Sequence, residues 1–373
     1  DPKDGLALLI DLERPTSKTL LRDLVTLLRD SVWKNLANLA FFVNNQARYR
    51  VVLAGRHLAI LNNELGPKLK FPSPYVLSPF NFYYVDKSVR EFLGQDTTER
   101  SAQQLAAHLL YLTGGHPRCM ARTLEFYEQH RIDPDEFVSR WSNDIWEDIV
   151  HPVVEEILKE TPKMNRVMKY LSSLSVFRYL DDFTITDLKT EWRVDDINSP
   201  YQFQDELTAT FLFEGGGRVV THDIIRRLVF IRESRKRKEK RFKALCKRAQ
   251  RIYADNIKKL DAPEPHNRVI EYLILALWQR RNEIQDYEKR SQLRKRFLEE
   301  DLPEVLKCYI DERNIKPTTL LGEQRQLISK MDEDWEFRFT VNYYLRESDY
   351  SSENGPYGEL KEAISRFFRE RTI

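Results

Sequence analysis

The sequence predicts a predominantly α-helical chain that begins with a small parallel α/β sheet, and three observations support this fold class. Two short apolar runs, Leu6–Ile10 and Tyr49–Gly55, flank an amphipathic segment, which is the strand–helix–strand order of a parallel sheet. From residue 86 onward, apolar residues recur mostly at helical spacing. Two further short apolar runs flank the glycines of 215–217, which predicts a β-hairpin.

Composition sets the broad class. The chain has 373 residues, with 60 basic and 58 acidic side chains and a net charge of +2, so no overall charge attracts a polyanion. Its length favours two or three domains. The longest unbroken apolar run, Tyr272–Trp278, is far shorter than the roughly 20 residues of a membrane span, so we expect no membrane partner. No signal peptide is visible, which favours the cytoplasm, and three scattered cysteines indicate neither a disulfide framework nor a zinc site.

The helices expected after the sheet follow from their start and stop signals. A third strand is expected at Tyr75–Phe80, and Asp86 is expected to cap the next helix. Gly114 and Gly115 predict the end of a helix that begins near Ser101, and Pro117 suits the first turn of the next one. Because proline breaks a helix interior, Pro152 is expected to begin a segment within 137–161.

The segment 162–232 has the order of a winged helix, with three short helices followed by the hairpin at 211–221. Charged helices are expected over most of the remainder. The predicted domains are the α/β part at 1–86, a helical domain at 87–161, the winged helix at 162–232 and a C-terminal helical bundle at 233–373.

Polar residues follow the first two predicted strands where each one ends. Asp11 and Glu13 come after the first strand, and Arg56 follows the second. A carboxylate at such a strand end suits nucleotide-bound Mg²⁺, a second one can orient an attacking water, and an arginine can contact a γ-phosphate. The alternatives are surface carboxylates at the start of a loop and an arginine that pairs with them.

Two more elements carry candidate residues. In Gly115-His116-Pro117, glycine lets the backbone approach a flat ligand closely. In Thr221-His222-Asp223, the histidine can bond a phosphate oxygen while the aspartate caps the next helix. Taken alone, each is also explained as an ordinary helix–helix turn or as a capping aspartate beside a bystander histidine.

The order and separation of these four elements resemble those of the STAND class of P-loop NTPases, the signal-transduction ATPases that include nucleotide-binding immune receptors. The resemblance spans about residues 6–232 and implies that 1–86 is the remnant of a P-loop NTPase domain. It implies ATP/ADP and Mg²⁺ as cofactors. The implied roles for the residues of this chain are Asp11 on magnesium, Glu13 on the hydrolytic water, Arg56 on the γ-phosphate, Gly115 at the nucleotide, Pro117 on the adenine, and His222 on the β-phosphate of ADP.

The chain departs from the family in two places. It contains no Gly-x-x-x-x-Gly-Lys-Ser/Thr loop, which we expect upstream of Asp1, and its Asp11-Leu12-Glu13 spacing differs from the adjacent acidic pair usual in the family. The resemblance implies a slow, regulatory ATPase switch in signalling or defence. Its helical tail would act as sensor or autoinhibitor and would bind protein partners. Exchange of ADP for ATP would release the domains from one another, and the active form would then oligomerise.

Two rival functions stay open. One is a DNA-binding ATPase of the origin-recognition or transposition-regulator kind, in which the wing and the basic stretch 232–251 contact duplex DNA. The other is a non-enzymatic protein-interaction scaffold. Apolar residues at helical spacing inside the basic stretch, Phe242, Leu245, Ala249 and Ile252, favour a solvated helix with one buried stripe. The aromatic segments Phe80–Tyr84 and Trp335–Tyr344 are expected in the core, and Cys119 is expected to be inert.

Overall fold

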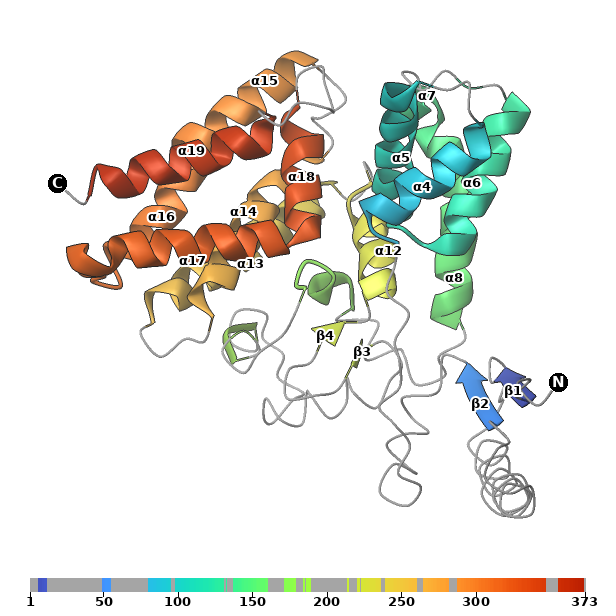
Figure 1. Cartoon of the computed structure of the whole chain (residues 1–373), viewed down its shortest axis with the longest axis horizontal. Helices are drawn as coiled ribbons and strands as arrows, with labels where there is room; N and C mark the ends of the chain where they lie inside the picture. Colours follow the sequence, from blue (N-terminus) through green and yellow to red (C-terminus); the bar gives the residue numbers. More distant parts are fainter. Residues whose placement is uncertain are drawn as a thin grey trace. The chain divides into compact units, whose positions relative to one another are not determined.

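The structure is a computed structural model, and its described residues are predominantly helical, as expected (Figure 1). The chain divides into two compact units, one made of 1–77 and 204–217 and the other of 78–203 and 218–373. The described ranges are 6–11, 49–54, 80–94, 98–130, 132, 137–159, 171–178, 184, 186–188, 213–214, 220–221, 223–235, 239–259, 264–281, 287–346 and 355–371.

The described part of the first unit consists of short strands. β1 (Leu6–Asp11) and β2 (Tyr49–Ala54) pair in parallel, with Leu6 opposite Tyr49 and Asp11 opposite Ala54. β3 (Phe213–Glu214) also belongs to this unit. The predicted helix at 17–36 lies outside the described residues. Of the third predicted strand only Phe80 is described, and its backbone is not in a strand.

The second unit begins with helices that mostly match the sequence patterns. They are α4 (Phe82–Leu93), α5 (Glu99–Thr113), α6 (Pro117–His130), α7 (Phe137–Asp144) and α8 (His151–Lys159). The expectation that Asp86 caps a helix is wrong. The N-cap of α4 is Asn81, whose side chain accepts a hydrogen bond from the Tyr84 amide, and Asp86 lies inside the helix, where it pairs with Arg90 at 2.8 Å.

Pro152 does not begin a segment, contrary to the sequence-based expectation. α7, the π-helical segment Ile145–Val150 and α8 follow one another without a break from 137 to 159, so Pro152 lies inside a continuous helical run. Proline has no amide proton to donate to the preceding turn. The π-helical segment directly before α8 changes the hydrogen-bond pattern where that donor is missing.

The tail of the second unit is a helical bundle around one central helix. It contains α13 (Glu239–Lys258), α14 (Pro265–Trp278), α15 (Tyr287–Arg296), a π-helical segment (Phe297–Asp301), α16 (Leu302–Ile310), a 3₁₀ turn (Pro317–Thr319), α17 (Leu320–Glu333), α18 (Trp335–Leu345) and α19 (Pro356–Arg369). All residues from Arg268 to Trp278 are buried, because α14 packs against α13, α16, α17 and α18. The sequence patterns do not predict α16.

Burial confirms the stripe expected on α13 and corrects one aromatic segment. Phe242, Leu245, Ala249 and Ile252 are all buried. In the segment 80–84, however, Tyr83 is 69% exposed and Tyr84 54% exposed, so these two tyrosines are not core residues. Phe337, Tyr343 and Tyr344 of the second aromatic segment are buried, as expected.

Only parts of the predicted winged helix fall within the described residues. They include β4 (Val220–Thr221) and α12 (Asp223–Glu233), which occupy the expected positions of the second wing strand and the helix after it. Residues 225–231 of α12 are buried without interruption. Such burial means that α12 is covered on all sides, since a surface helix exposes every third or fourth residue.

Candidate functional site

The turn between α5 and α6 has a backbone that only glycine fits well. Gly114 ends α5 in the left-handed region at φ 63°, and its amide donates to the Leu110 carbonyl. Gly115 follows at φ 79°, and a Cβ atom there would lie 2.3 Å from the Phe80 carbonyl oxygen. The Phe80 amide donates to the Gly115 carbonyl at 3.0 Å. The backbone at Phe80, just before α4, therefore packs directly against this turn, and this close approach is possible because glycine has no side chain.

The same turn packs against α12. A Cβ atom on Gly114 would lie 2.9 Å from the Arg227 Cβ, so no side chain separates the turn from this helix. The Arg227 guanidinium also donates to the Gly114 carbonyl at 3.4 Å and stacks on the Trp335 ring at 4.5 Å. Because α12 begins one residue after His222, the Gly-x-Pro element packs against the helix that follows the His-Asp motif.

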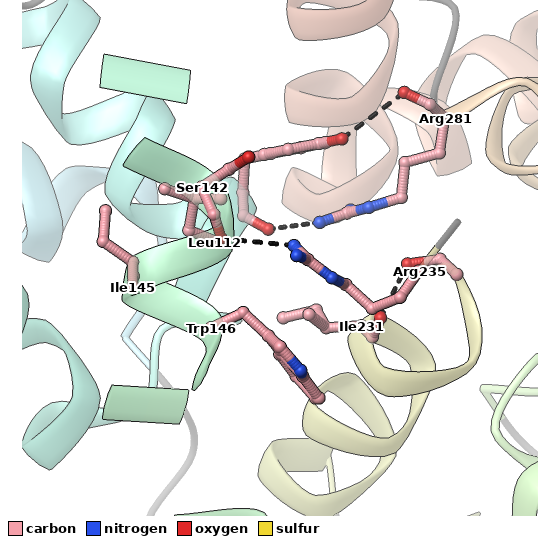
Figure 2. A pocket seen from close by; sticks show the side chains of 9 residues that line it. Leu112, Ser142, Ile145, Trp146, Ile231, Arg235 and Arg281 are labelled. Carbon is pink, nitrogen blue, oxygen red and sulfur yellow. Dashed lines mark hydrogen bonds between the residues drawn. The ribbon is translucent and has the colours of Figure 1, made fainter. Parts of the chain in front are cut away.

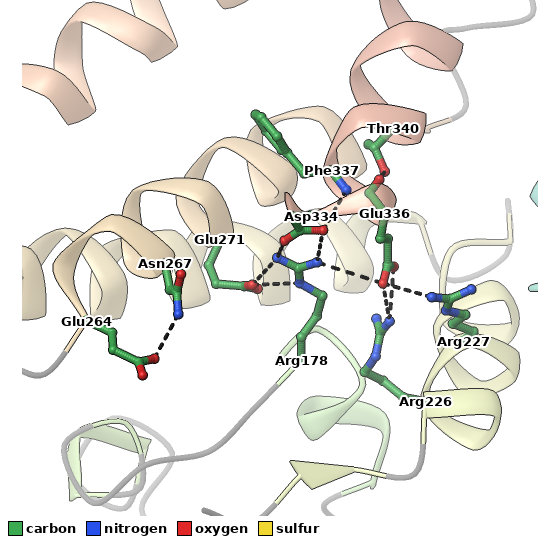
Figure 3. A network of polar contacts seen from close by, with 10 residues as sticks. All are labelled: Arg178, Arg226, Arg227, Glu264, Asn267, Glu271, Asp334, Glu336, Phe337 and Thr340. Atoms are coloured by element: carbon green, nitrogen blue, oxygen red, sulfur yellow. Dashed lines mark hydrogen bonds and ion pairs between the residues drawn. The ribbon is translucent and has the colours of Figure 1, made fainter. Parts of the chain in front are cut away.

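An arginine–carboxylate network joins α12 to the tail. Figure 3 shows its members, which are Arg178, Arg226, Arg227, Glu271, Asp334 and Glu336. Glu336 accepts hydrogen bonds from both Arg226 and Arg227 at 2.9 to 3.0 Å. Arg178 binds Asp334 through two bonds of 2.9 and 2.6 Å and also donates to Glu271 at 2.6 Å. Three cations and three carboxylates balance, which is how buried charge becomes tolerable.

Burial and ion pairing shift the pKa values of two carboxylates of this network in opposite directions. Burial raises the pKa of Glu271, although the Arg178 guanidinium opposes that rise. The pKa of Asp334 is lowered: burial acts to raise it, but the charge of Arg178 and the bond that it donates outweigh burial. Arg178 donates to both carboxylates, and the second carboxylate oxygen of Glu271 is buried without a hydrogen-bond partner. The ion pairs fix the positions of the members of this network.

Two small cavities lie beside these contacts, and neither has the size of a ligand site. One, of about 50 Å³, lies between Gly114, Arg227, Trp335 and Glu336. The other, of about 30 Å³, is shown in Figure 2, where the side chains of Arg235 and Arg281 extend side by side in the same direction. Small-molecule sites typically measure roughly 300–1,000 Å³, whereas a volume of this order holds one or a few waters.

The two arginines in Figure 2 act as links between helices. Arg281, 8% exposed, donates to the Tyr111 carbonyl and lies 3.6 Å from the Tyr111 ring centroid. Arg235 donates to the Ser142 carbonyl at 3.2 Å and lies over the Trp146 ring at 5.5 Å. Backbone carbonyls and the faces of aromatic rings both attract cations, so these contacts account for both charges.

The structure places some of the predicted site residues. Asp11 is the last residue of β1, at the carboxyl edge of the two-stranded sheet. Gly115 is buried in the α5–α6 turn, and Pro117 is the exposed first residue of α6. Glu13, Arg56 and His222 lie outside the described residues. Within the second unit, the structure therefore brings the Gly-x-Pro turn to α12 and leaves the other roles as predictions.

Sequence reasoning missed the network entirely. One signal was present, because Glu271 is the single carboxylate within the apolar run of α14, and a lone charge in such a run predicts a buried ion pair. Asp334 also carried a signal as the N-cap of α18, where it accepts from the Phe337 amide at 3.0 Å. Nothing in the sequence connects either residue with Arg178.

The described residues were also searched for a metal site, a reactive cysteine and a membrane-spanning helix. They contain no group of three histidine, cysteine or acidic side chains placed to hold a metal ion. Cys119 is buried, and burial raises the pKa of its thiol to about 12, which supports the expectation that this cysteine is unreactive. Among the same residues, no helix combines the length and apolarity that crossing a membrane requires.

Comparison of the chain with models of protein families, with curated proteins and with solved structures identifies no match.

Proposed function

We propose that the chain is the body of a regulatory ATP/ADP switch of the STAND type. ADP would hold the α/β part, the helical segment and the winged-helix segment together, and exchange for ATP would release them. The helical tail would act as sensor or autoinhibitor and contact protein partners, and the released form would oligomerise. Turnover would be slow, since a switch needs differential affinity for two states and not rapid catalysis.

One observation carries the proposal: the contact between the Gly-x-Pro turn and α12. The Gly-x-Pro turn and the helix that follows His222 are far apart in the sequence, yet the Gly114 carbonyl lies within hydrogen-bonding distance of Arg227 on that helix. Pro117 is exposed beside this turn, so an adenine ring has access to it. The nucleotide would lie on this exposed side, because the cavity of about 50 Å³ beneath Gly114 is too small.

The arginine–carboxylate network supports a coupling role for α12. Arg226 and Arg227 fix the helix to Glu336 at the start of α18, and Arg178 continues the chain of contacts to α14. A displacement of α12 would break its contacts with the Gly-x-Pro turn and with Glu336 at the same time. Two discrete positions of α12 would therefore be more stable than the positions between them. Asp11, Glu13 and Arg56, with Mg²⁺, keep their implied roles at the phosphates within this proposal.

Hydrogen exchange with and without Mg²⁺-ADP tests the proposal on the longest natural form of the protein, because these 373 residues contain no Gly-x-x-x-x-Gly-Lys-Ser/Thr loop. We expect ADP to slow amide exchange at 113–117 and at the first turn of α12, and His222→Ala to abolish this protection. His130→Ala, a change of an exposed histidine on α6, serves as the matched control and retains the protection. Absence of protection at millimolar ADP, or equal protection in both variants, would overturn the proposal and favour the scaffold alternative.

A further inference from the structure

Two arginines line the small cavity of Figure 2, and neither pairs with a carboxylate in the part of the chain that the structure describes. Arg281 is only 8% exposed, and Arg235 is half-buried. Both guanidiniums donate to neutral oxygens, which belong to Ser142 and Asn143 for Arg235 and to Tyr111 and Tyr344 for Arg281. These contacts account for where the two charges lie, but they supply no negative charge.

The partial charges nearby balance the arginine pair only in part. Arg235 follows the end of α12, and Arg281 reaches the last turn of α5. The carbonyl end of a helix carries about half an elementary negative charge, so two such ends leave roughly one positive charge over. Glu147 attracts Arg235 from outside ion-pair distance and is itself 67% exposed. Burial lowers the pKa of Arg235, and the charge of Arg281 acts in the same direction.

Each guanidinium also keeps a donor for a further acceptor. A guanidinium has five N–H groups, and the hydrogen bonds of Arg235 and Arg281 come from the terminal nitrogens alone. Among the described residues, the Nε–H of either arginine has no acceptor. Aromatic rings hold both groups in place, since Arg281 lies 3.6 Å from the Tyr111 ring centroid and Arg235 lies 5.5 Å from that of Trp146. The two cations are therefore positioned before any ligand arrives.

We propose that Arg235 and Arg281 together bind one small inorganic oxyanion of the phosphate class in this cavity. The several oxygens of such an anion match the N–H groups that remain on two guanidiniums, and its charge balances the pair. The cavity of about 30 Å³ has room for a few waters and none for an organic ligand. Its size therefore favours a free anion over the phosphoryl group of a larger molecule.

The anion site joins the two halves of the second unit. Arg281 follows α14 of the tail, whereas α5 and α7 contribute Tyr111 and Ser142 to the cavity wall. The site is separate from the proposed nucleotide site, because Arg235 follows the C-terminal end of α12 and His222 precedes its N-terminal end in the sequence. The 11 residues of α12 span about 16 Å. Binding of the anion would therefore stabilise the contact between the halves.

Thermal unfolding of the 373-residue chain in increasing inorganic phosphate tests the inference, with sodium chloride added to keep the ionic strength constant. A dissociation constant of about 1 mM is the order that two charge-assisted hydrogen bonds supply. We then expect 50 mM phosphate to raise the unfolding midpoint by about 5 °C. Broadening of the phosphorus-31 resonance of phosphate by the folded protein gives a second readout, which does not depend on unfolding.

The variant Arg235→Gln removes one of the two charges from the cavity. We expect its affinity for phosphate to fall about tenfold, so the rise in the midpoint falls to about half. Lys307→Gln, which removes an exposed cation on α16, is the matched control and keeps the wild-type rise. No rise in the wild type, or an equal rise in the two variants, would overturn the inference, because phosphate would then act at most as a general stabilising salt.

Glycerol phosphate tests the source of the anion. Its alcohol group needs room that the cavity lacks, so we expect a smaller rise in the midpoint than inorganic phosphate gives. An equal or larger rise would overturn the assignment of a free anion and favour the phosphoryl group of an organic ligand.

The inference does not depend on the nucleotide switch. The measurement contains no nucleotide, and its variants lie outside the turn at 113–117 and outside α12. Loss of ADP protection with the phosphate effect intact would refute the switch alone, and the reverse result would refute the anion site alone.

Discussion

Acidification should destabilise the protein through one buried histidine, His108 of α5. Its side chain is 6% exposed, and its Nδ1 lies 2.9 Å from the hydroxyl of Tyr343 on α18. Burial lowers its pKa from 6.5 to about 3, and the nearby charges of Arg346 and Arg290 act in the same direction. The folded protein therefore keeps this imidazole neutral in a range where the unfolded chain protonates it.

The magnitude follows from linkage between protonation and folding. Below pH 6.5 the unfolded state binds a proton that the folded state refuses, so the free energy of unfolding falls as pH falls, until the folded pKa near 3 is reached. Each pH unit in this window costs up to about 1.4 kcal/mol, and the loss from pH 7 to pH 4.5 amounts to about 2.5 kcal/mol.

Urea unfolding at pH 7, 5.5 and 4.5 measures this loss. His108→Gln keeps a polar partner for Tyr343 but cannot titrate, so its stability should fall by about 2.5 kcal/mol less than that of the wild type over this range. His130→Gln, which changes an exposed histidine, should follow the wild type. The reasoning is refuted if the wild type and His108→Gln lose the same free energy.

Two further predictions concern the glycine turn and the network. Gly115→Ala should cost about 3 kcal/mol, because φ is 79° and the new Cβ would overlap the Phe80 carbonyl oxygen at 2.3 Å. Gly322→Ala, in open space on α17, should stabilise by about 0.5–1 kcal/mol, and equal urea midpoints for the two variants would contradict this account. Glu336→Gln should cost about 3 kcal/mol by the same assay, since it leaves two buried arginines without their carboxylate. Glu362→Gln on the exposed side of α19 should change stability by less than about 0.5 kcal/mol, and a similar value for Glu336→Gln would reduce that contact to a surface ion pair.

The helices were predictable where local signals are strong. The end of α5 at Gly114 and the start of α6 at Pro117 depend on backbone geometry that these two residue types favour, so the sequence indicates both boundaries. The buried stripe of α13 follows from spacing alone. By contrast, Asn81 and Asp86 are both good N-caps, and composition does not reveal which of them begins α4.

The candidate site was predictable only in part, because its contacts are not local. Arg178 meets Glu271 across 93 positions and Asp334 across 156, and no short-range pattern encodes such pairs. The exposure of Tyr83 and Tyr84 likewise depends on what packs beside α4 and not on residue type. The Gly-x-Pro turn was found because glycine and proline mark backbone shape directly.

The burial of α12 on all sides has a mechanical consequence. This helix touches α5 and α8 on the N-terminal side of the unit and α13 in the tail, so each half supplies part of the other's interior. Neither half can melt first without exposing residues such as Leu228 and Phe230 to water. Calorimetry of this unit should accordingly record one cooperative transition, and cleavage between Glu233 and Glu239 should weaken both fragments.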